Sequence, residues 1–110
     1  QMNQIITPAQ IEARLYALSK ELDLAHEEVN KCESEYHMTT AQYEVAMARS
    51  RMTYASKSSP TGKNYTVQER EDIALLENEN LHFDKNIAEA KVKAAQQQYG
   101  ALTSTGGFDS

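Results

Sequence analysis

The sequence predicts an all-α protein built from two long helices that are joined by a short bend. The 110 residues include only two Pro and four Gly, and neither type occurs between Ala9 and Ser59. Apolar residues recur in steps of three and four, which is the spacing of a helix face. A cluster of Ser, Pro and Gly near residue 60 is the one strong break in this pattern. A chain of this length forms a single domain with a modest core.

The first helix is expected from about Pro8 to about Ser56. Thr7 supplies a capping hydroxyl, Pro8 takes the first helical position, and Gln10 completes a capping box. The apolar seam that follows continues for more than four heptads, as in coiled coils. Its members are Ile11, Leu15, Leu18, Leu22, Ala25, Val29, Cys32, Tyr36, Thr39 and Tyr43.

The second helix is expected over residues 66–103, after a bend at 57–65, and it starts with a capping box of Thr66 and Glu69. It carries two apolar stripes about 100° apart. The first consists of Ile73, Leu76, Asn80, Phe83, Ile87, Ala90 and Ala94. The second consists of Leu81, Ala88, Val92, Ala95, Tyr99 and Leu102. One partner helix covers only one stripe, so we expect the second stripe to contact another copy of the chain.

The predicted architecture is therefore an antiparallel coiled-coil hairpin, residues 8–103, that assembles into a helical oligomer. Asn80 at a seam position is expected to fix the register or the number of chains. The sequence leaves open that number, and also whether the second helix packs on its own first helix or on that of a neighbour.

The two ends of the chain are expected to lie outside this domain. Residues 1–7 form a leader in which Gln1 is expected to be a cloning remnant before a native Met2. Residues 104–110 are rich in Gly and small polar residues and are expected to form a flexible tail.

Membrane, disulfide and enzyme classes find no support in the sequence. No apolar run approaches a membrane span, and the single Cys32 suits a reducing, cytoplasmic location and a packed position. The pairs Asp23–His26 and Glu79–His82 have a metal-ligand spacing but fall beside the stripes. We therefore expect no catalytic residue, metal or cofactor.

The charge is distributed unevenly along the chain. Sixteen acidic residues outnumber eleven basic ones, yet no acid occurs from Val45 to Gln68. Cations interleaved with aromatic residues are typical of sites for single-stranded nucleic acid. The cations of this stretch are Arg49, Arg51, Lys57 and Lys63, and the aromatic residues Tyr54 and Tyr65 bracket the bend. A solubilising bend without a ligand is the alternative interpretation of the same pattern.

The run "VAMARSRMTYASKSS" and the following "EREDIALLENENLHFDKNIAEAKV" are similar to the central segment of the UvsY-type phage recombination mediators. The similarity covers residues 41–108, including Gly107-Phe108 near the end. It implies a small oligomeric helical protein of DNA recombination and repair that binds single-stranded DNA in the host cytoplasm. It also implies that a recombinase or a single-strand-binding protein is a partner. By position, the resemblance implies that Arg49, Arg51 and Lys57 contact the DNA and that Tyr54 stacks on a base. Lys63 and Arg70 would assist from the far side of the bend.

A second function class remains open. The same stripes are expected in a helical-hairpin interaction module, such as an adaptor, chaperone or structural component, whose bend has no role in binding nucleic acid.

Overall fold

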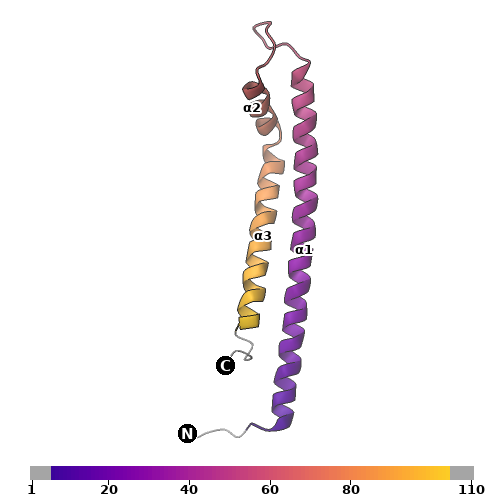
Figure 1. The fold of residues 1–110 in the computed structure, drawn as a ribbon, viewed down its shortest axis with the longest axis vertical. Coiled ribbons are helices and arrows are strands. Elements are labelled where there is room, and N and C mark those ends of the chain that lie inside the picture. Colours follow the sequence, from indigo (N-terminus) through magenta and orange to yellow (C-terminus); the bar gives the residue numbers. More distant parts are fainter. Residues whose placement is uncertain (1–5, 105–110) are drawn as a thin grey trace.

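The structure is a computed structural model that describes residues 6–104. The molecule is a thin rod of 84 × 22 × 18 Å. It contains three helices, α1 (Pro8–Ala55), α2 (Val67–Glu77) and α3 (Glu79–Ser104), and no named strand within the described residues. After a turn at residues 56–66, α2 and α3 run back along α1 and form what we call the return limb (Figure 1). The all-α prediction is confirmed.

The helix starts follow from local hydrogen bonds. At α1, the Thr7 hydroxyl accepts from the Gln10 N–H at 3.2 Å, and the Gln10 side chain accepts from the Thr7 N–H at 2.9 Å. Thr66 and Glu69 form the same box at α2, with distances of 3.1 and 2.8 Å. Each box satisfies two backbone donors that a helix start leaves without a partner.

The core between the two limbs is narrow and built from small side chains. Among the described residues the buried apolar ones are Cys32, Met47, Ala74, Ala88, Val92 and Ala95. Cys32, Val92 and Ala95 form its centre, with Val29 and Tyr36 packed against them. The inward position predicted for Cys32 is thus confirmed, and burial together with the Glu28 carboxylate raises the pKa of its thiol.

The two stripes of the return limb have the opposite roles to those predicted. Ala88, Val92 and Ala95 are buried within the chain, while Leu81, Tyr99 and Leu102 are half-buried. The stripe that was expected to contact another copy therefore packs inside this chain. Its alanines explain the choice, because small side chains let two helix axes approach closely.

The other stripe is largely exposed. Leu76, Phe83 and Ile87 all lie on the surface of the return limb. The stripe that was predicted to lie in the seam is therefore the one that this chain leaves uncovered.

The return limb was predicted to be a single helix. It is two helices instead, because the helix breaks at Asn78. The Asn78 amide donates to the Ala74 carbonyl at 2.8 Å and to the Ser50 hydroxyl of α1 at 3.0 Å. Its own N–H is shared between the carbonyls of Ala74 and Leu75, which is common where a helix ends. Asn80, the residue predicted to set the register, is exposed. Asn78 makes the contact across the limbs instead.

The first helix extends beyond its partner. His26 of α1 lies beside Tyr99 of α3, so the end of α3 at Ser104 is level with about residue 22, and roughly 20 Å of α1 lies beyond it at 1.5 Å per residue (Figure 1). Ile11 and Leu15 of the predicted seam fall in this part and are exposed.

Candidate nucleic-acid interface at the turn

The turn that joins the limbs is held by its own hydrogen bonds. The Gly62 N–H donates to the Ser59 carbonyl at 2.9 Å, and the Ser59 N–H donates to the Lys63 carbonyl at 2.8 Å. Pro60 and Gly62 take the second and fourth positions of this four-residue turn, where Pro and Gly are favoured. Gly62 has a φ of 82°, which glycine adopts at little cost. Lys63 follows at once and is exposed.

Two tyrosines from either side of the turn pack against each other. Tyr54 ends α1 and Tyr65 precedes α2, and their rings meet edge to face with centroids 5.5 Å apart. The Lys57 ammonium lies 5.1 Å from the Tyr54 ring centroid. The structure thus brings together Lys57 and the two tyrosines that bracket the bend in the sequence, Tyr54 and Tyr65.

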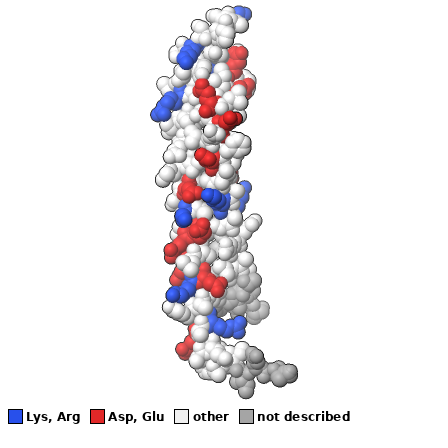
Figure 2. Space-filling model, turned by 180° about the vertical axis from the view of Figure 1, so that it is seen from behind, with Lys and Arg blue, Asp and Glu red and all other residues white. Residues whose placement is uncertain are grey.

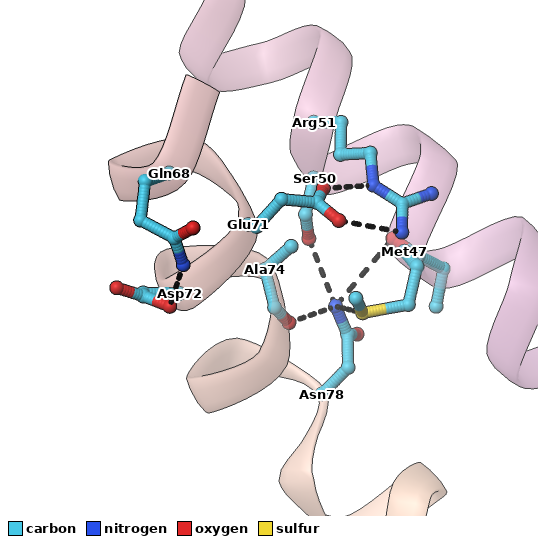
Figure 3. A network of polar contacts seen from close by, with 9 residues as sticks. Met47, Ser50, Arg51, Gln68, Glu71, Asp72, Ala74 and Asn78 are labelled. Atoms are coloured by element: carbon cyan, nitrogen blue, oxygen red, sulfur yellow. Dashed lines mark hydrogen bonds and ion pairs between the residues drawn. The ribbon is translucent and has the colours of Figure 1, made fainter. Parts of the chain in front are cut away.

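Arg51 is paired with an acid from the return limb. Its guanidinium bonds both carboxylate oxygens of Glu71, with the Nη2 to Oε1 distance at 3.2 Å (Figure 3). The bond from Arg51 and its positive charge lower the pKa of Glu71, and the same contact raises the pKa of Arg51. Both side chains are nearly half-exposed, so a phosphate could compete with Glu71 for this arginine.

Glu77 makes a second set of contacts near the turn. Its carboxylate accepts from the Tyr54 hydroxyl and, at 3.0 Å, from the Ser50 hydroxyl. These bonds lower the pKa of Glu77, and the bond to Glu77 raises the pKa of Tyr54. Through Ser50 the contacts continue to Asn78 at the helix break.

The other candidate cations have different environments. Arg70 is half-buried, and its guanidinium donates to the Tyr65 carbonyl at 3.2 Å, which ties the start of α2 to the turn. Arg49 is exposed on α1 beside an apolar hollow lined by Ala41, Val45 and Leu81. Lys63 follows the four-residue turn, whereas Arg49 lies on α1, so the predicted residues are spread between the turn and the helices.

The acid-free segment of the sequence is not free of acid in space. Glu71 and Glu77 of α2 contact residues 50–54 directly, and Figure 2 shows acidic and basic side chains close together at the end that carries the turn. The charge pattern along the sequence does not show this, because the acids lie twenty or more residues downstream. The heptad spacing of the limbs was the signal that would have paired them.

Other chemistry is not supported by the described part of the chain. No group of three or more His, Cys, Asp and Glu residues among residues 6–104 is arranged to hold a metal ion. Within the same range no helix has the length and apolar character needed to cross a bilayer. The fold and site therefore define a class: an elongated, all-helical protein with a mixed-charge, aromatic turn.

Comparison of the chain with protein-family models, curated proteins and solved structures gave no match. The similarity to recombination mediators therefore rests on the residue pattern alone.

Proposed function

We propose that this chain is a non-enzymatic, self-associating accessory protein of phage-type recombination or replication. In this proposal it is an antiparallel coiled-coil hairpin that binds single-stranded DNA at its turn. The observation that carries the proposal is the grouping of Lys57 and Lys63 with the Tyr54–Tyr65 pair at one end of the rod. Cations attract the phosphates, and aromatic rings stack on bases regardless of sequence.

The six candidate residues take graded roles in this proposal. Lys57, Lys63 and the two tyrosines contact DNA first, because they lie in the turn or in the last turn of α1 beside it. Arg51 contributes when a phosphate replaces Glu71. Arg49 and Arg70 lie to the sides and add to the general attraction.

Self-association strengthens a weak site. One chain offers few cations, but several turns presented together bind one strand with a high effective concentration. The partners implied by the resemblance, a recombinase and a single-strand-binding protein, would act on the same strand, and the host cytoplasm remains the expected location.

The test is fluorescence anisotropy of a labelled poly-dT oligonucleotide, titrated with the protein at several salt concentrations. We expect saturable binding that weakens steeply with salt, as displaced counterions require. Changing Lys57→Glu and Lys63→Glu together is expected to weaken binding at least about tenfold, because both phosphate contacts become repulsive.

The matched control changes the same charge far from the turn. Lys20→Glu with Lys31→Glu alters two exposed lysines of α1 and should leave affinity within roughly twofold, because this site lies several Debye lengths away. Equal loss in both variants, or no binding at low salt, would contradict the proposal.

A protein-interaction module without a role in DNA binding is the second candidate. The exposed Leu76, Phe83 and Ile87 favour it, since a row of large apolar side chains on one helix face is a typical docking surface. A stoichiometric partner that protects these residues, combined with no DNA binding, would establish this function instead.

A further inference from the structure

Besides its inward seam, α1 carries an apolar stripe that faces away from the core. Its members follow one another in steps of three and four, and all are exposed: Met38, Ala41, Val45, Ala48, Met52 and Ala55. Met38, Val45 and Met52 are 63%, 54% and 75% exposed. Each comes two positions after an inward residue (Tyr36, Tyr43 or Ser50), which is about 200° around a helix. We call this set the α1 outer stripe.

The return limb has an equivalent stripe on its own outer side. It consists of Leu76, Asn80, Phe83, Ile87, Ala90 and Ala94, and we call it the return outer stripe. Leu76, Phe83 and Ile87 are 70%, 61% and 53% exposed. Leu76 and Ala90 follow the buried Ala74 and Ala88 by two positions, so this stripe also points away from the core. The rod therefore has an apolar stripe on each of two opposite sides.

The two stripes overlap in height over most of their length. Contacts between the limbs show this: Ser50 bonds Glu77, the rings of Tyr43 and His82 lie 5.5 Å apart, and Glu35 pairs with Lys91. Residues 38–55 are thus level with the part of the return limb near residues 71–88. Each stripe is roughly 26 Å long at 1.5 Å per residue.

The stripes also match in size and charge. Alanines alternate with larger residues on α1, while the return outer stripe presents Leu76 and Phe83, so large side chains can pack over small ones. Acids border the return outer stripe near the turn: Glu69 and Asp72 precede Leu76 by seven and four residues, and Glu79 follows it by three. On α1 the matching height carries Arg49, for which no ion pair is found among the described residues.

We propose that the α1 outer stripe of one copy packs against the return outer stripe of a second copy, with both rods pointing the same way. This pairing uses both stripes of every copy, and it brings Arg49 of one chain to the height of Glu79 in the next. Because the two contacting surfaces differ, the interface is heterologous, and repetition gives a ring or a row with all turns at one end. The inference rests on the self-association, and not on the DNA binding, of the proposed function.

The experiment uses cross-linking of single-cysteine additions. Ala48→Cys and Asn80→Cys place thiols at similar heights on the two stripes, and both positions are exposed. The variants are prepared separately and also co-expressed in equal amounts, then treated with a short bismaleimide. The unmodified chain is the control for Cys32, which is buried and has a thiol of raised pKa.

We expect neither single variant to cross-link, and we expect the co-expressed pair to form covalent dimers at about a quarter of interfaces, as random pairing of unlike surfaces predicts. The chain with both changes should give a ladder of multimers. Self-linking of either single variant would overturn the heterologous pairing in favour of a two-fold interface. An oligomer with no cross-link in the mixture would overturn this interface alone.

Sedimentation of the unmodified chain separates this failure from that of the proposed function. A monomer at tens of micromolar would overturn both the interface and the self-association. If the chain cross-links as expected but does not bind poly-dT, only the proposed DNA binding is overturned, because the cysteines lie outside the turn.

Discussion

In the proposed DNA site, the ion pair with Glu71 limits how much of the positive charge of Arg51 is available to a phosphate. The pair is nearly half-exposed, and such pairs contribute little to stability because water and salt screen them. Its main consequence lies in binding, since Glu71 holds the fork of donors that a phosphate would use.

We expect Glu71→Gln to strengthen poly-dT binding about two- to fivefold at low salt, which is the range that one exposed ion pair represents. The gain should shrink as salt rises. Asp84→Asn is the matched control, because it removes one exposed acid of α3 that has no contact with Arg51. Anisotropy titrations measure both variants. Equal gains would show that only net charge matters, and no gain would show that Arg51 does not contact DNA.

The carboxylates near the turn make the stability of the folded chain depend on pH. The folded-state pKa values of Glu71 and Glu77 lie below the ordinary value of 4.5, because both accept hydrogen bonds in the folded chain. Their contribution is therefore present above pH 4.5 and is lost as pH falls through the lowered values. Tyr54 has a pKa raised above 10.0, so its contribution is present below pH 10 and is lost as pH rises through the raised value.

Thermal melts followed by circular dichroism should thus show constant stability between about pH 6 and 9 and a fall on both sides. In Tyr54→Phe the loss above pH 10 should be smaller, because the titrating hydroxyl is absent. An unchanged alkaline fall in this variant would rule out the Tyr54–Glu77 bond as its cause.

Among the elements, the helix boundaries were predictable and the helix break was not. Thr7 and Thr66 begin their helices with capping boxes that are complete within four residues of sequence. Asn78 ends α2 by a bond to Ser50, which lies 28 positions earlier. The sequence "ENEN" at 77–80 contains two asparagines, which are weak helix formers, but only the position of α1 determines which asparagine is used.

Two substitutions test the role of Asn78 at the helix break, one at Asn78 and a control at Asn80. Asn78→Ala should lower the free energy of unfolding by about 1 kcal/mol. The two hydrogen bonds donated by the Asn78 side chain are lost, and the higher helix propensity of Ala offsets only part of that loss. Asn80→Ala should be neutral or slightly stabilising, because Asn80 is exposed. Urea unfolding of both variants measures the difference. Equal effects would contradict the role assigned to Asn78.

At the scale of the whole molecule, the sequence predicted that the return limb has two apolar sides but not which side turns inward. Both stripes have the same spacing, and the large residues Leu76, Phe83 and Ile87 made the exposed one the more hydrophobic in appearance. Close packing along a thin rod instead favours the small Ala88 and Ala95. The α1 outer stripe was not predicted, because only one apolar seam was traced along the first helix.

The length of the rod has a consequence for the acidic character of this chain. The formal net charge of −5 suggests repulsion of nucleic acid, but the rod is 84 Å long. Ionic screening at physiological salt decays over about 8 Å. A strand at the turn is therefore shielded from the carboxylates of the far half, and only the charges of the nearest one or two helical turns act on it. Attraction at the tip is consequently compatible with a low isoelectric point, and the overall charge of such a rod says little about what its end can bind.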